Sequence, residues 1–204
     1  MFNDEQSDMY LFIENGIRGG MSFIGHRYSK ANNKYMANYN KEKPSKYIMY
    51  YDANNLYGWA MNQQLAVGNF KWESTMNWNT ERIMNIDAEN STGYIFEVDL
   101  EYPKEIHDLH NHYPLCPERK LVKTEWLSDY QQAFKKKLSI TNDHVEKLVS
   151  DLTNKYKYTV HYRNLQLYLS LGMKLLNVHK VLSYKQEPLL KEYITSNSIL
   201  RQKD

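Results

Sequence analysis

The chain has 204 residues, of which 42% are hydrophobic and 25% are charged, so one packed domain is expected and wholesale disorder is excluded. Its formal net charge of +2 is too small to indicate nucleic-acid binding by itself. Cys116 is the only cysteine, which excludes a disulfide framework and favours a reducing compartment. No run of 18 apolar residues and no basic leader occur, so the sequence predicts a soluble intracellular protein, nuclear or cytoplasmic, with no membrane partner.

The amino-terminal part alternates short elements with polar connections. A helix is predicted over residues 1–15, followed by a strand over 21–28 and a turn-rich polar loop over 29–46. Residues 47–51 are aromatic and β-branched and follow a proline, which predicts a buried strand. A helix over 56–63 comes next.

The rest of the chain mixes both element types. In chain order we predict an irregular segment (73–92), a half-buried strand (93–101), an extended loop (102–120), a helix (125–138), a short helix (143–152), a strand (156–162), a helix ending at Gly172 (163–171), a strand (178–186) and a last helix from Pro188. Four apolar residues of the helix over 125–138 recur every four positions, on one face: Trp126, Tyr130, Phe134 and Leu138.

Two groups of polar residues have simple explanations. His107, His110, His112 and Cys116 lie close together, but their spacing matches no common zinc site, so the histidines are interpreted as polar loop residues and Cys116 as a small apolar residue. The lysines near residues 34–46 and at 135–137 can meet phosphates, although isolated lysine patches are usually solvated surface.

Asp52 directly follows the predicted strand 47–51. A carboxylate at a strand end is a hard oxygen ligand of the kind that Mg²⁺ prefers, although it is more often a turn residue. The following turn offers backbone groups to phosphates, and the ring of Tyr57 can stack under a sugar. These features favour chemistry on a nucleoside triphosphate.

Two motifs resemble those of one enzyme family. Asp52-Ala53-Asn54-Asn55-Leu56-Tyr57-Gly58 resembles motif A of family B DNA polymerases, Asp-x-x-Ser-Leu-Tyr-Pro. Ile17-Arg18-Gly19-Gly20 resembles the Tyr-x-Gly-Gly motif that precedes motif A in the protein-primed branch, and the 32 positions from Gly20 to Asp52 are similar to that branch. Segments 68–72, 94–100 and 158–165 also resemble the polymerases of Maverick/Polinton-type mobile elements, so the resemblance covers nearly all of residues 10–200.

The resemblance implies template-directed nucleotidyl transfer, in which a primer 3′-oxygen attacks the α-phosphate of a dNTP and pyrophosphate leaves. Asp52 and Tyr57 would be the catalytic residues: Asp52 would bind two Mg²⁺ ions, one of them completed by the Ala53 carbonyl, and Tyr57 would exclude a 2′-hydroxyl. Nucleotide-binding residues would be Asn54, Asn55, Leu56 and Tyr57. DNA-binding residues would be Arg18, Gly19 and Gly20. The implied partners are primer-template DNA, dNTP and, in the protein-primed branch, a priming protein at the insertion over 121–155.

The sequence departs from the family pattern in several places. Ile17 replaces the tyrosine of the glycine motif, Asn55 replaces serine and Gly58 replaces proline. The chain contains no fingers motif, Lys-x-x-x-Asn-Ser-x-Tyr-Gly, and no Asp-Thr-Asp motif for the second metal carboxylate. No exonuclease acidic motif precedes Ile17.

These observations predict an α/β (α+β) fold with an incomplete palm-type antiparallel sheet, flanked by helices and carrying a helical insertion. Residues 1–46 would be a linker with the glycine motif, 47–120 the first part of the palm, and 121–204 the insertion and the return to the palm, ending before the fingers. We expect such a fragment to be inactive alone. The alternative interpretation is a domesticated remnant that acts as a DNA-binding or protein-interaction module.

Overall fold

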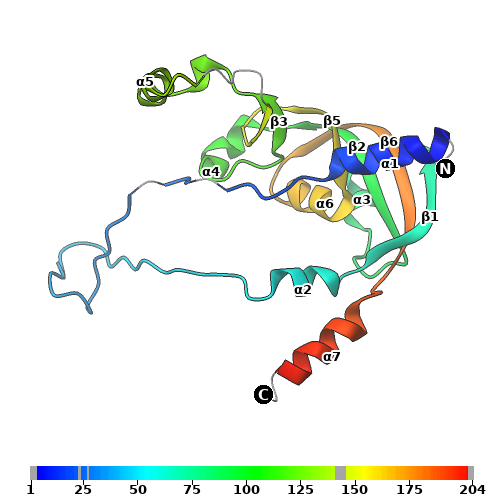
Figure 1. Ribbon diagram of the computed structural model, residues 1–204, viewed down its shortest axis with the longest axis horizontal. Coiled ribbons are helices and arrows are strands. Elements are labelled where there is room, and N and C mark those ends of the chain that lie inside the picture. Colours follow the sequence, from blue (N-terminus) through cyan, green and yellow to red (C-terminus); the bar gives the residue numbers. More distant parts are fainter. Residues whose placement is uncertain (1–3, 23, 27, 141–145, 202–204) are drawn as a thin grey trace.

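The centre of the fold is a four-stranded antiparallel sheet (Figure 1). The computed structural model describes residues 4–22, 24–26, 28–140 and 146–201. The strand order is β1-β6-β2-β5, and the strands are β1 (Leu65–Glu73), β6 (Lys174–Glu187), β2 (Thr92–Glu101) and β5 (Lys155–His161). Helices accompany this sheet, so the predicted α+β fold with an antiparallel sheet flanked by helices is confirmed.

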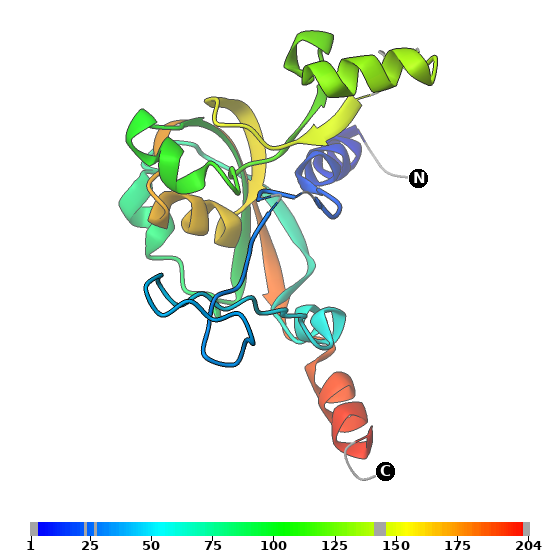
Figure 2. The same ribbon diagram turned by 90° about the vertical axis from the view of Figure 1, so that its left-hand side faces the viewer.

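Helices cover both faces of the sheet (Figure 2). The amino-terminal helix α1 (Asp4–Gly16) lies on one face, and α3 (Thr80–Met84) and α6 (Tyr162–Ser170) lie on the other. Successive side chains of a strand point to opposite faces. The neighbouring cross-strand pairs Ile95–Leu182 and Phe96–Val181 therefore serve different clusters, the first beneath α1 and the second in the main core.

Local sequence signals explain the ends of α6. His161 is its N-cap residue, and its Nδ1 atom accepts a hydrogen bond from the Arg163 amide at 3.3 Å. Gly172 follows the helix with a φ of +99°, a conformation that side chains with a Cβ rarely adopt. The predicted end of this helix at Gly172 is confirmed.

A two-stranded arm projects from the sheet (Figure 1). It consists of β3 (Glu118–Leu121), the short helix η2 (Thr124–Trp126), α5 (Asp129–Lys137) and β4 (Glu146–Val149). A capping box starts α5, because the Ser128 hydroxyl accepts from the Gln131 amide while the Gln131 side chain accepts from the Ser128 amide. Where it is described, the segment predicted to be a helical insertion therefore contains strands as well as helices.

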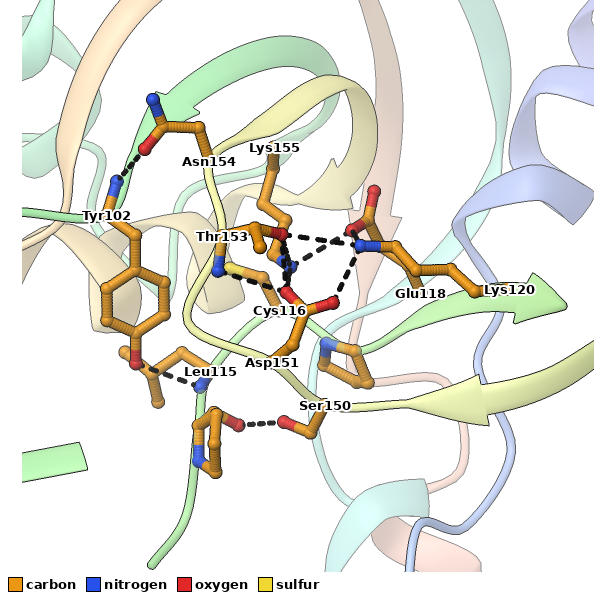
Figure 3. Close-up of polar contacts among 12 residues, drawn as sticks. Tyr102, Leu115, Cys116, Glu118, Lys120, Ser150, Asp151, Thr153, Asn154 and Lys155 are labelled. Atoms are coloured by element: carbon orange, nitrogen blue, oxygen red, sulfur yellow. Dashed lines mark hydrogen bonds and ion pairs between the residues drawn. The ribbon is translucent and has the colours of Figure 1, made fainter. Parts of the chain in front are cut away.

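A cluster of four charged side chains joins the arm to the sheet (Figure 3). The Lys155 side chain is fully buried, and its ammonium lies 2.7 Å from Asp151 and 3.0 Å from Glu118. Lys120 contacts the same two carboxylates, each at 2.8 Å. Thr153 adds a hydroxyl to the cluster. Two cations and two anions balance, which is what allows a lysine to be buried at this position.

The structure corrects several predicted elements. Residues 47–51 form neither a strand nor part of the core, because their side chains are 53–90% exposed and, within the described chain, no backbone hydrogen bond joins them to another segment. The predicted loop over 102–120 instead contains η1 (Lys104–Ile106), α4 (His107–His110) and the start of β3. The prediction of a short helix over 143–152 is wrong, because Glu146–Val149 forms the strand β4. Residues 143–145 of that prediction lie outside the described part of the chain.

Smaller differences concern element ends. The helices predicted around motif A and at the carboxyl end are present as α2 (Leu56–Met61) and α7 (Lys191–Arg201), and α3 interrupts the segment predicted to be irregular. The strand expected over 21–28 is absent from its described residues, while 23 and 27 lie outside the described part. Within the described residues, no helix is both long and apolar enough to cross a membrane.

We predict that Lys155→Met lowers the free energy of unfolding by about 3 kcal/mol, because it leaves Glu118 and Asp151 facing each other with one cation fewer. This value is at the lower end of the range for broken buried pairs, since the two carboxylates are 22% and 26% exposed. Urea unfolding followed by tryptophan fluorescence measures it. The control is Lys174→Met, which removes a 63% exposed lysine 3.8 Å from Glu101 and should change the free energy by less than about 1 kcal/mol. Equal losses in the two variants would contradict this interpretation.

The same cluster predicts an acid-sensitive fold. Burial raises the pKa of the Asp151 carboxyl, but hydrogen bonds from Lys120, Lys155 and Thr153 outweigh burial and hold this pKa well below its usual range. A carboxyl with a depressed folded pKa contributes stability above its unfolded pKa of about 3.9, and that stability is lost as the pH falls towards the folded pKa.

We therefore expect the free energy of unfolding to decrease below about pH 4, and Asp151→Asn to flatten this decrease while lowering stability at pH 7. Urea titrations between pH 2.5 and pH 7 measure both effects. Part of the slope should persist in this variant, because the Lys157 amide and His179 outweigh burial and hold the pKa of Asp99 low as well. An unchanged slope in Asp151→Asn would refute the assignment.

Candidate functional site

Asp52 lies in an exposed connection that leads into α2, and not at the end of a strand as predicted. Residues 51–57 are all exposed, including Ala53 and Asn54, and the ring of Tyr57 is 85% exposed. Figure 1 shows this connection as an extended segment that runs from the distant loop around residues 30–46 back to α2. The carboxylate and the ring are thus accessible to a ligand from solvent.

The two departures from motif A lie against each other. Asn55 is the N-cap residue of α2 and has a φ of 51°, in the left-handed region that asparagine tolerates better than most residues. Its side chain covers the Cα atom of the buried Gly58, where a Cβ would lie 2.6 Å from Oδ1 and 2.7 Å from Cγ of Asn55. A Cβ at position 58 would therefore have to displace the side chain of Asn55.

Arg18 is held firmly on β5. Its guanidinium donates to the Thr159 carbonyl at 2.7 Å and to the Gly16 carbonyl at 3.2 Å. The same group lies over the Tyr158 ring, 3.9 Å from the ring centroid. These contacts fix where the chain leaves the sheet at the start of the glycine motif.

The chain itself does not require glycine at positions 19 and 20. Both residues are exposed, neither has a positive φ, and a Cβ at either would meet no atom within 4 Å. By contrast, a Cβ at Gly93 would collide with the Tyr184 ring. Within the described chain, no steric contact therefore selects glycine at positions 19 and 20.

The predicted DNA-binding residues and the predicted nucleotide-binding residues do not contact each other in the structure. Among the described residues, no hydrogen bond or ion pair links Arg18, Gly19 or Gly20 to the stretch Asp52–Tyr57. The cavity beside Arg18 has a volume of about 490 Å³, and its lining mixes three cations with three carboxylates: Arg18, Arg119, Lys157, Glu14, Glu97 and Glu118. Its charges balance, so charge alone does not make it an anion site.

The oxygens at Asp52 fit one Mg²⁺ ion better than two. Mg²⁺ retains several waters and typically takes one or two carboxylates together with substrate phosphates. Asp52 and Ala53 are both exposed, so a solvated ion can reach them. Within the described part of the chain, no group of three or more His, Cys, Asp or Glu residues is arranged to hold a metal.

The histidine cluster has separate partners and does not converge. His107 and His110 contact the backbone carbonyl and the hydroxyl of Tyr102, at 3.2 and 2.8 Å, while His112 contacts the Gly25 carbonyl at 3.0 Å. Cys116 is buried against Met173, and burial raises the pKa of its thiol well above the usual range. His107 and His110 thus lie in α4 and not in a loop as predicted, whereas Cys116 is buried as expected of a small apolar residue.

His161 is also structural. Its Nδ1 atom accepts from the Arg163 amide, so in the neutral ring Nε2–H donates to the Tyr184 hydroxyl at 2.7 Å. Burial, reinforced by the nearby Arg163, lowers the pKa of His161 to about 4, so the neutral ring persists at physiological pH.

No protein-family model matches the sequence, and comparison with curated proteins and with solved structures found no match either.

We predict that Gly58→Ala does not slow hydrogen exchange in α2, although alanine favours a helix over glycine by about 1 kcal/mol, because the new Cβ must displace the Asn55 side chain. The amides to follow are those of Trp59 and Asn62, which bond to the Asn55 and Gly58 carbonyls at 3.0 and 3.1 Å. Asn55→Gly keeps the left-handed conformation but removes the obstructing side chain. The double variant should therefore exchange more slowly than Gly58→Ala alone, and independent effects of the two changes would contradict the coupling.

Proposed function

We propose that the chain carries the first part of the nucleotide site of a protein-primed-like family B DNA polymerase. The observation that supports this most directly is the ordered pair of motifs, Arg18-Gly19-Gly20 followed 32 positions later by Asp52 and then Tyr57. The exposure of Gly19, Gly20 and the stretch from Asp52 to Tyr57, and the glycine pair that this chain does not itself need, also support the proposal.

In this proposal each exposed group has one task. The Asp52 carboxylate and the Ala53 carbonyl would hold Mg²⁺, which when bound would neutralise charge on the transferred phosphate. Asn54, Asn55 and Leu56 would approach the triphosphate. The Tyr57 ring would lie under the deoxyribose, where a 2′-hydroxyl would collide with it. Arg18, Gly19 and Gly20 would receive the template backbone, with the Arg18 guanidinium already fixed on β5.

A lone carboxylate does not position two metal ions, and the sequence contains no fingers motif. We therefore propose that the chain binds nucleotide and DNA but does not extend a primer unaided. The priming protein of this polymerase branch would meet the projecting arm, where α5 ends in Lys135, Lys136 and Lys137.

An interaction module is the second candidate, and the apolar side chains of the arm favour it. The four residues predicted to share a helix face do not all lie in α5, because Trp126 belongs to η2 and Leu138 caps the helix. All four are 47–75% exposed, and the rings of Tyr130 and Phe134 stack with centroids 6.1 Å apart. Such an apolar group on an arm suits a protein partner.

Nucleotide binding distinguishes the two candidates. We expect the chain to bind dNTP only when Mg²⁺ is present, to lose most of this affinity in Asp52→Asn, and to bind dNTP more tightly than rNTP. Tyr57→Val should bring the two affinities within about twofold of each other, because it removes the ring that excludes the 2′-hydroxyl. Isothermal titration calorimetry with dATP and ATP, with and without Mg²⁺, measures all of these quantities.

Tyr50→Val is the matched control, since this tyrosine is 90% exposed in the same connection and has no proposed role. Nucleotide binding that is absent, or that ignores both Mg²⁺ and Asp52, would favour the interaction module. Primer extension by the wild-type chain that disappears in Asp52→Ala would show that one carboxylate is sufficient.

A further inference from the structure

The loop over residues 30–46 concentrates the positive charge of the chain. It contains five lysines and one glutamate, a net charge of +4, whereas the whole chain carries +2. The remainder of the protein is therefore net negative. All five lysines are exposed, and among the described residues none has a carboxylate within ion-pair distance. The five are Lys30, Lys34, Lys41, Lys43 and Lys46.

Hydrogen bonds rather than a hydrophobic core hold this loop in shape. Asn32 and Lys46 close it by pairing their backbones at 2.9 and 2.7 Å. The Asn32 side-chain amide then donates to three carbonyls across the loop, those of Asn40, Lys43 and Pro44, at 3.0–3.3 Å. Its oxygen accepts from the Asn40 amide at 2.9 Å. One asparagine thus organises the loop from its centre, as in a compact Ω-loop.

A second asparagine fixes the turn beside it. Asn33 is 8% exposed, and its side chain donates to the Lys46 carbonyl at 3.3 Å and accepts from the Tyr35 amide at 3.2 Å. Figure 1 shows the loop at the end of an excursion from the sheet, far from the packed core. Order this far from a core points to a use for the loop's own surface.

The loop encloses a cavity with basic walls. The cavity has a volume of about 650 Å³, within the range of roughly 300–1,000 Å³ that is usual for ligand pockets. Three lysines line it, Lys30, Lys43 and Lys46, and Glu42 is not among its lining residues. The cavity beside Arg18 has three carboxylates in its lining and the loop cavity has none, so the loop cavity is the better anion site of the two.

Exposed aromatic rings accompany the lysines of the loop, although neither Tyr28 nor Tyr35 lines the cavity itself. Tyr35 is 78% exposed and Tyr28 is 73% exposed, and the Lys34 ammonium lies 5.1 Å from the Tyr35 ring centroid. Lysines interleaved with exposed rings suit a nucleic-acid strand, because the cations meet phosphates while unpaired bases stack on the rings. An isolated phosphate would use the lysines but not the tyrosines.

We infer that the loop over residues 30–46 is a preformed binding site for the backbone of a single-stranded nucleic acid, with the phosphates at Lys30, Lys43 and Lys46 and a base on Tyr35. This inference deepens the proposed function by adding a contact to the template strand. It is tested without nucleotide or Mg²⁺, so its failure is distinguishable from failure of the site at Asp52.

The test measures binding of a fluorescein-labelled dT₁₂ strand to the full chain by anisotropy, between 50 and 300 mM KCl. The wild type should bind with a salt-dependent affinity. The triple variant Lys30→Gln, Lys43→Gln, Lys46→Gln should bind at least tenfold more weakly at 100 mM KCl, with a salt slope lower by about 2, as expected for three lost phosphate contacts at about 0.7 each. The matched control replaces three exposed lysines of the sheet domain, Lys71, Lys104 and Lys174, and should change affinity by less than threefold.

Two further variants separate a built site from a diffuse charge. Asn32→Ala keeps every lysine but removes the centre of the loop, so it should weaken binding at least fivefold at unchanged net charge. Tyr35→Ala should weaken binding about fivefold or more with an unchanged salt slope, because it removes stacking and not charge. The inference is overturned if the wild type does not bind dT₁₂, if both triple variants weaken binding equally, or if Asn32→Ala binds like the wild type. Thermal unfolding verifies that each variant retains its core.

Discussion

The arm and the sheet are held in register by the ion cluster around Lys155. Lys155 is the first residue of β5, and its ammonium is buried. The partner carboxylates are Glu118 of β3 and Asp151, which follows β4. One cluster therefore fixes where the arm leaves the domain and where β5 begins. β5 in turn supplies the Thr159 carbonyl and the Tyr158 ring that hold Arg18. A charge balance at the base of the arm is thus connected through one strand to the glycine motif.

Three of the four sheet strands, together with α1 and α6, could be predicted from the sequence, whereas β1, α3 and the two strands of the arm could not. Alternation over residues 93–101 identifies β2 because one face is fully buried and the other is half-buried. The same reasoning fails at 47–51, where the composition is that of a strand but no neighbouring segment supplies hydrogen bonds. β4 was mistaken for a helix because its pairing with β3 is non-local.

Individual site residues could be named from the sequence, but the contacts between their side chains could not be predicted. Asn55 and Gly58 stand out separately as departures from a motif, and only the structure places one side chain over the other Cα. Asn32 gives no signal at all in a segment rich in asparagine, since its role depends on carbonyls 8–12 positions away. Lys155 is equally inconspicuous, because the two carboxylates that allow its burial lie in other elements.

The exposed segment 47–51 has a consequence for how the protein behaves in solution. Its backbone donors and acceptors are left to water within the described structure, and its side chains are mostly aromatic. Such a ribbon readily recruits another extended segment edge to edge, from a partner or from a second copy. Lys46 and Asp52 are the charged residues that bracket it in the sequence. Charges at the ends of an apolar extended segment oppose edge-to-edge self-assembly, and these two side chains occupy those positions.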